Sequence, residues 1–261
     1  MKTALEEIKF RLSYLEKLSN GRPSESLPNS KKAFIFRNIG WQYYGIYLYK
    51  ISLGMDVDGL LKDVIEMNKL AIGANESNEL LSLEPIFISK LLLTEDVSDV
   101  CAKIVELARA NTDEYVDPLI IVLSCLRRGE NYEQYMDWFR KKENEKYTSI
   151  LSGSSKAITY LINRDEDNLA LTLNSMLLIH HKEANNRHSG IYNSCGSFLS
   201  FAPFLILELA EHLGMNVKSK ISENKQVLKL GLSSPADFPN LPKNIKMPIE
   251  VDYLTAKTNL E

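Results

Sequence analysis

An excess of basic residues, paired cysteines and long apolar stretches are all missing from this 261-residue sequence. The formal net charge is −3, which argues against a general nucleic-acid-binding protein because such a protein needs a basic surface. The three cysteines, Cys101, Cys125 and Cys195, show neither a CxxC motif nor the Cys/His spacing of a zinc site. Cys101 and Cys125 lie in apolar helical patterns, and buried free thiols there fit a reducing compartment.

The longest apolar run, residues 198–210, is shorter than the roughly 20 residues that a membrane-spanning helix needs. The first residues carry charges where a signal peptide needs an apolar stretch, namely Glu6, Glu7, Lys9 and Arg11. We therefore expect a cytoplasmic protein without a membrane partner.

Convincing strand patterns are also missing, and nearly every segment has the 3.6-residue period of a helix. We expect Asp56 or Asp58 to cap one helix and Pro85 to open another, since proline suits a first helical turn. Helices are predicted over 3–19, 31–53, about 57–73, 85–93, 97–110, 117–128, 131–142, 148–163, 166–188 and 197–213.

The pattern predicts an all-α fold, an irregular solenoid-like bundle of about ten helices with a Pro-rich C-terminal coil. We expect a single all-helical domain over 1–261, with N-terminal helices in 1–93, helical hairpins in 97–213, and a coil and tail in 214–261. No fixed repeat period is present.

Aromatic residues gather in 31–53 and fall all around that helix, which is typical of a central, buried helix. Trp41 is therefore predicted to be a structural core residue. The alternative for this helix is a pocket or partner surface that uses the tyrosine hydroxyls.

Three of the four histidines lie in "HHKEANNRHSG", residues 180–190. On a helix that begins after Asp165, His180 shares the apolar face with Leu173 and Leu177, so we assign it a structural role. His181 and His188 are about 10.5 Å apart along a helix, too far to bind one zinc ion. A metal site would instead need the pairs His180/Glu183 and Glu208/His212 to converge, and such pairs are non-specific.

Catalytic motifs are missing as well: no phosphate-binding loop, G-x-G-x-x-G or G-x-S-x-G sequence is present. The acidic run at 165–167 is ordinary for a first helical turn. We therefore expect neither an enzyme nor a cofactor. What remains is a polar surface for partner binding, which we assign to His181, Glu183, Asn186, Arg187, His188 and Tyr192. The alternative is a solvated helix end.

The order of features in residues 165–254 resembles a known family. A helix ends at His180 and His181, a polar link with Gly190 follows, then an apolar helix reaches Gly214, and "PIEVDYL" comes last. The segment 209–217, "LAEHLGMNV", approximates the progression "ALAxxxGxxV". This arrangement is similar to all-helical immunity proteins of bacterial polymorphic toxin systems, most of all to the family numbered forty-nine.

The resemblance implies an antitoxin that binds a cognate toxin domain inside the cell and blocks its active site or its access to substrate. Mild acidity would suit a basic toxin through faster association. Two alternatives remain at this point: a helical-repeat adaptor that binds a peptide or protein, and a helical metalloenzyme. The sequence predicts neither the oligomeric state nor the identity of the toxin.

Overall fold

In the residues that it describes, the computed structural model contains eleven helices and no strand. The all-α prediction with about ten helices is thereby confirmed. None of the helices in these residues is long and apolar enough to cross a bilayer. The described residues are 4–20, 27–52, 57, 59–74, 79–110, 118–143, 153–184, 186, 188 and 201–222.

The chain divides into two compact units, residues 1–100 with 237–261 and residues 101–236. The prediction of a single domain over 1–261 stays a prediction. The Pro-rich coil falls outside the described residues, as do Asp56, Asp58 and Cys195. Cys101 and Cys125 are both buried, as predicted.

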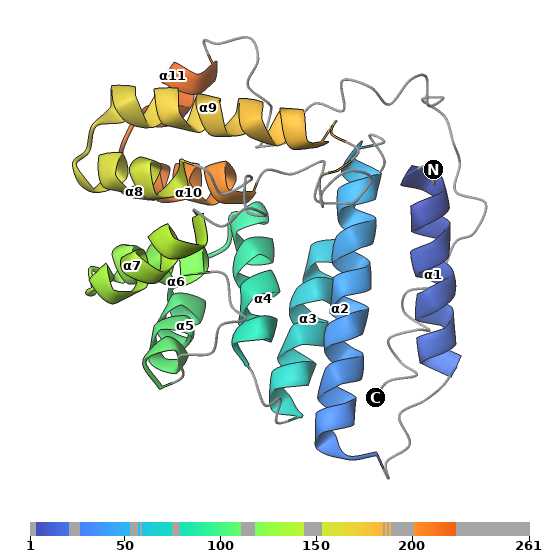
Figure 1. Ribbon diagram of the computed structural model, residues 1–261. Helices are drawn as coiled ribbons and strands as arrows, with labels where there is room; N and C mark the ends of the chain where they lie inside the picture. The colour runs from blue at the N-terminus through green and yellow to red at the C-terminus, as the bar shows by residue number, and fades with distance from the viewer. Residues whose placement is uncertain are drawn as a thin grey trace. The chain divides into compact units, whose positions relative to one another are not determined.

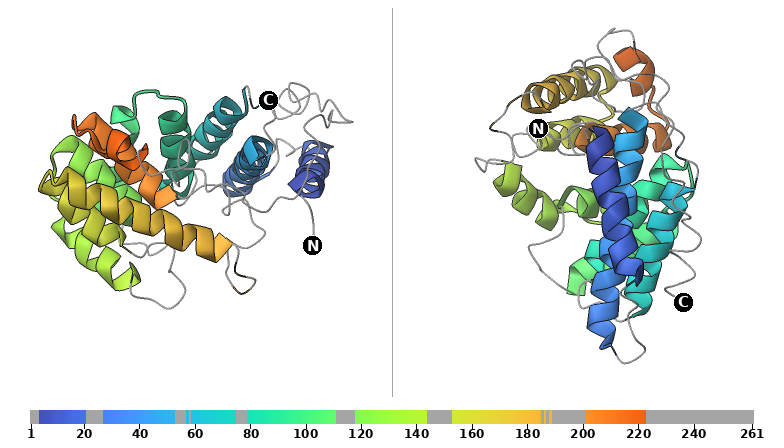
Figure 2. Two further views of the ribbon diagram at one scale, coloured as in Figure 1. Left: turned by 90° about the horizontal axis from the view of Figure 1, so that it is seen from above. Right: turned by 90° about the vertical axis from the view of Figure 1, so that its right-hand side faces the viewer.

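In the first unit, α1 to α4 lie side by side (Figures 1 and 2). Their bounds are Ala4–Asn20 (α1), Asn29–Ser52 (α2), Leu60–Gly73 (α3) and Leu80–Leu92 (α4). α2 contacts the three others and is buried along most of its second half, which agrees with the predicted central helix.

Two glycines let neighbouring helices approach α2 closely. A Cβ at Gly40 would lie 2.5 Å from Nδ2 of Asn68 on α3, and a Cβ at Gly45 would lie 2.5 Å from the Arg11 guanidinium on α1. Arg11 also donates through Nη1 to Oε1 of Gln42 at 3.0 Å, and its guanidinium lies 5.7 Å from the ring centroid of Tyr49. The α1–α2 contact therefore includes an arginine that packs over a residue without a side chain.

Two predictions in this unit are wrong. Trp41 is 41% exposed and is not a core side chain, although Tyr43 and Tyr44 beside it are buried. Pro85 does not open its helix, because α4 begins at Leu80 and contains Pro85 in its interior. The apolar residues before Pro85 make the first turns favourable in spite of the hydrogen bond that proline cannot donate.

The second unit consists of α6 to α11 and most of α5. The bounds are Ser98–Ala110 (α5), Pro118–Arg128 (α6), Glu133–Glu143 (α7), Ser154–Ile162 (α8), Glu166–Ala184 (α9), Phe201–His212 (α10) and Val217–Ser222 (α11). α9 packs on α8, α10 and α11 (Figure 1), and α10 also contacts α6.

The ends of α6 and α10 follow the sequence prediction. Gly129 and Gly214 adopt positive φ angles of 67° and 76°, which glycine tolerates without strain. The next amide then donates back into the helix, from Met215 to the Ala210 carbonyl at 2.9 Å in α10. The chain then forms α11, which the sequence did not predict.

Candidate partner-binding surfaces

His180 lies on the apolar face of α9, where the sequence placed it. Its side chain is 3% exposed, and its neighbours on the same face, Leu173, Met176 and Leu177, are buried. A histidine in this position is inaccessible to a protein partner. It therefore belongs to the interior of the second unit.

The predicted polar surface begins where α9 ends. α9 stops at Ala184, so the prediction that the helix continues to residue 188 is wrong. The Asn186 amide donates to the Glu183 carbonyl at 3.1 Å, and the His188 amide donates to Oδ1 of Asn186 at 3.0 Å. These bonds terminate the helix, because the Asn186 side chain accepts a hydrogen bond from the amide two residues further on.

Three of the six predicted contact residues can be placed at this helix end. Glu183 and Asn186 are half-buried, and His188 is exposed. The side chain of His181, and Arg187 and Tyr192 altogether, lie outside the described residues. The partner-binding assignment of all six stays a prediction.

The described residues contain no group of three or more His, Cys, Asp or Glu side chains that could hold one metal ion. His180, Glu183, Glu208 and His212 therefore do not converge into the four-ligand site that a metalloenzyme would need. Burial raises the pKa of the Cys125 thiol to about 11, and the nearby Glu130 carboxylate adds to the effect. The thiol is therefore protonated at neutral pH and a poor nucleophile.

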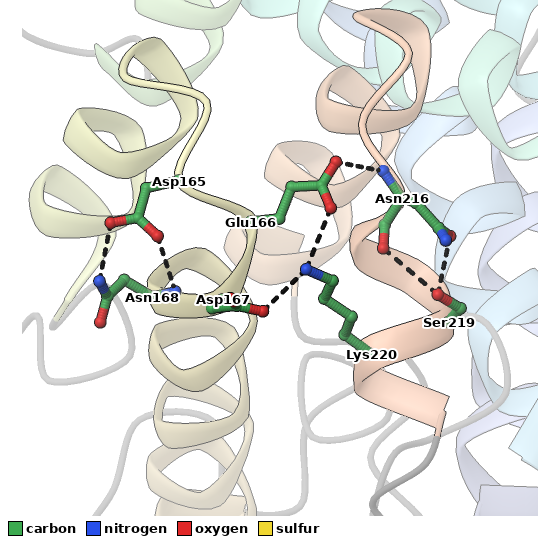
Figure 3. A network of polar contacts seen from close by, with 7 residues as sticks. All are labelled: Asp165, Glu166, Asp167, Asn168, Asn216, Ser219 and Lys220. Carbon is green, nitrogen blue, oxygen red and sulfur yellow. Dashed lines mark hydrogen bonds and ion pairs between the residues drawn. The ribbon is translucent and has the colours of Figure 1, made fainter.

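The acidic run at the start of α9 has a structural role (Figure 3). Asp165 accepts hydrogen bonds from the backbone amide and from Nδ2 of Asn168, at 3.2 and 2.7 Å, and so caps α9. Glu166 accepts from the Asn216 amide at 2.9 Å, and Lys220 bridges Glu166 and Asp167 at 3.1 and 2.7 Å. We call Glu166, Asp167, Asn216 and Lys220 the α9–α11 clamp.

An exposed aromatic surface lies on the first half of α2. Phe34 is 57% and Trp41 is 41% exposed. The Arg37 guanidinium lies 5.8 Å from the ring centroid of Phe34, and Trp41 meets Tyr44 edge-on with 5.9 Å between ring centroids. Spacings of three and four residues put Phe34, Arg37 and Trp41 on one face of the helix. We call these three residues the α2 aromatic stripe.

The same face of α2 is covered further along the helix. Gly45 lies under the Arg11 guanidinium of α1, and Leu48 is buried. The aromatic stripe is therefore the part of this face that α1 leaves open. The sequence contained a signal for it, since a partner surface was the alternative reading of this aromatic helix.

The second exposed apolar surface lies on the outer face of α9. Leu171 is 64% and Leu178 is 54% exposed. They share this face with three exposed residues, and together the five form what we call the α9 outer stripe: Asn168, Leu171, Ser175, Leu178 and Lys182. The two leucines are seven residues apart, which is two helical turns.

A shallow groove of about 310 Å³ runs between α8 and the edge of the α9 outer stripe. Its lining is mixed, with a lysine and a tyrosine from α8 beside apolar and hydroxyl side chains from α9. The lining residues are Gly153, Lys156, Tyr160, Asn168, Leu171, Thr172, Ser175, Met176 and Ile179. The sequence analysis missed this surface because it followed only the apolar stripe that contains His180.

No family model, no curated protein and no solved structure matches this chain. The resemblance to immunity proteins therefore depends on the sequence features in residues 165–254 alone.

Proposed function

We propose that this protein is a cytoplasmic immunity protein that binds a cognate toxin domain and neutralises it by covering its active site or its substrate path. The observation that carries the proposal is the α2 aromatic stripe. Trp, Tyr and Arg are the residues that most often dominate the energy of protein–protein interfaces. Arg37 and Trp41 are of these types, and Phe34 lies beside them on the same helix face; contacts within α2 already hold the three side chains in place.

The exposure of these rings has an energetic cost that a partner would remove. A large aromatic side chain can bury about 150–250 Å² in a contact, and roughly half of each of these rings still faces water, which is unfavourable. Phe34 and Trp41 are two turns apart, so both can enter one partner surface together. A stoichiometric inhibitor needs no chemistry of its own, and the described residues offer no metal cluster.

The end of α9 is the second proposed contact surface, through His181, Glu183, Asn186, Arg187, His188 and Tyr192. The net charge of −3 favours a basic toxin domain, since opposite charges accelerate association. A nuclease domain would fit that requirement.

The test uses the toxin domain encoded beside this gene, which we expect to be the variable C-terminal domain of a large secreted protein. Survival is scored when toxin and immunity protein are co-expressed, and affinity is measured by calorimetric titration. Trp41→Ala and Phe34→Ala should each weaken binding about tenfold or more, by the behaviour of central interface residues. Leu70→Ala is the matched control, because Leu70 is an exposed apolar residue on α3 of the same unit.

Arg187→Ala and His188→Ala are measured in the same assay and should each weaken binding by about 1–2 kcal/mol if they lie at the interface centre. Circular dichroism confirms that every variant is folded. The proposal is wrong if the wild-type protein neither binds the toxin domain nor protects the cell. If only the α9-end variants lose affinity, then the aromatic stripe is not the toxin-binding surface.

A further inference from the structure

We infer that the α9 outer stripe binds a second copy of this chain, so that two α9 helices pack antiparallel about a two-fold axis at Ser175. The inference does not rest on the proposed function, since it needs no toxin, although Lys182 at the end of the stripe lies beside the α9 residues proposed as the second toxin contact. It begins from Leu171 and Leu178, the two most exposed leucines among the described residues.

The order of residues along the stripe is self-complementary. In an antiparallel pair centred on Ser175, a residue before the centre faces the residue equally far beyond the centre on the other copy. Asn168, seven residues before the centre, then lies opposite the partner's Lys182, seven beyond it. Leu171, four before the centre, and the partner's Leu178, three beyond it, are offset by one residue, about 1.5 Å along the axis, and still pack against each other. Ser175 faces its own copy, and its small side chain allows the two helix axes to come close.

The charges at the two ends of the stripe favour the same arrangement. Lys182 is exposed at the C-terminal end of α9. Asp167, next to Asn168 at the N-terminal end, binds Lys220 at 2.7 Å, yet its side chain remains 83% exposed. An antiparallel pair brings each Lys182 towards the partner's Asp167. A parallel pair would bring the two Lys182 ammonium groups together and the two Asp167 carboxylates together, which is unfavourable.

The expected dimer is weak. One pair of helices buries less than the roughly 800 Å² per partner of a standard stable interface. We therefore expect a dissociation constant on the order of 10 µM or higher. Most of the other described apolar residues of α9 are buried inside the unit, and Ile179 is half-buried, so Leu171 and Leu178 are the apolar residues of the helix that remain most available.

Sedimentation velocity of the full chain from about 5 to about 500 µM measures the association directly. The wild type should pass from monomer to dimer over this range. Leu171→Lys and Leu178→Lys should each remain monomeric, since they place a charge in the apolar contact. Ile162→Lys is the matched control: Ile162 is an exposed apolar residue on α8 of the same unit, and its variant should dimerise like the wild type.

Cysteine cross-linking tests the position of the two-fold axis. In a Cys195→Ser background, Ser175→Cys should form an intermolecular disulfide under mild oxidation, because residue 175 meets its own copy at the axis. Arg164→Cys, which is exposed but lies off the axis, should form none. Four outcomes would each overturn the inference. The wild type stays monomeric throughout, the leucine variants still dimerise, the dimer forms without the Ser175→Cys cross-link, or the assembly is larger than a dimer.

Discussion

Gly40 is the residue where α2 and α3 leave the least room for a side chain. The Cβ of an alanine would lie 2.5 Å from Nδ2 of Asn68. Asn68 cannot easily move, because it is fully buried and its Nδ2 donates to the Val64 carbonyl at 2.8 Å. We expect Gly40→Ala to lower the free energy of unfolding by about 1–3 kcal/mol, as measured by urea denaturation.

Gly73→Ala is the matched control for this prediction. Gly73 is the last residue of α3 in the same unit, and an added Cβ there would meet nothing within 4 Å. The alanine should leave stability unchanged or raise it by up to about 1 kcal/mol, since it lowers the entropy of the unfolded chain. Equal losses in both variants would show that glycine is needed at Gly40 for a reason other than the contact with Asn68.

Trp41 and Tyr43 should differ sharply on truncation although only one residue separates them. Trp41 is exposed and loses mainly its edge contact with Tyr44, so Trp41→Ala should cost less than about 1 kcal/mol. Tyr43 is 2% exposed, and Tyr43→Ala should cost about 3–5 kcal/mol. Thermal unfolding compares the two. A large loss of stability in Trp41→Ala would show instead that Trp41 packs in the core.

The sequence predicted the burial of His180 but not the exposure of Trp41, and the reason is physical. α9 has a continuous apolar stripe, so the face that contains His180 could be read from the helical period alone. α2 has aromatics on every side, so its period does not show which side is covered. That depends on how far α1 extends along α2, which is fixed by the packing of Arg11 over Gly45.

At the scale of elements, the α9–α11 clamp should decide whether the short helix α11 stays docked. Six residues form too short a helix to be stable alone. Lys220→Met keeps most of the apolar stem but removes both ion pairs with α9. We expect faster hydrogen exchange of the amides in 216–222. Lys218→Met is the control, because Lys218 pairs with Glu211 on α10 and does not touch the clamp.

The clamp should also depend on pH. Hydrogen bonds from the Asn216 amide and Lys220 lower the pKa of Glu166. Glu166 therefore stabilises the docked α11 fully above its ordinary pKa of about 4.3, and this stabilisation is lost as the pH falls through the lowered pKa. Asp167 and Glu166 raise the pKa of Lys220. The stabilisation of the docked α11 by Lys220 is therefore lost only as the pH rises above about 10.4. Exchange in 216–222, corrected for intrinsic rates, should be slowest from about pH 5 to about pH 10. Unchanged protection at pH 3 would show that apolar packing holds α11 without the clamp.

The helix ends that the sequence predicted well are those with a local start or stop signal. Asp165 caps α9, and Gly129 and Gly214 end α6 and α10 as expected. α11 was missed because the Asn216 amide at its start bonds to Glu166, fifty residues earlier in the chain, and no local pattern records that bond. Pro85 misled the prediction because proline is also tolerated inside a helix when the surrounding packing is strong enough.

At the scale of the whole molecule, the question is whether the two compact units unfold together. Each has its own buried residues, for example Ile46 on α2 and Leu173 on α9, both fully buried. Ile46→Ala and Leu173→Ala should each lower the free energy of unfolding of the helices around the new cavity by about 2–5 kcal/mol. We expect each variant to accelerate hydrogen exchange mainly within its own unit, since cooperative unfolding units follow dense local packing.

The two variants control each other, because both remove buried apolar volume but from different units. In the first possible outcome, Leu173→Ala accelerates exchange in α8 to α10 and leaves exchange in α2 and α3 unchanged, and Ile46→Ala does the reverse. The chain then has two domains, and the single-domain prediction is wrong. If either variant lowers protection in both sets of helices by the same free energy, then residues 1–261 unfold as one domain, as the sequence predicted. The first outcome would also mean that variants of the α2 aromatic stripe and variants of Leu171 and Leu178 act in separate units, so the first test toxin binding without disturbing the dimerisation that the second test.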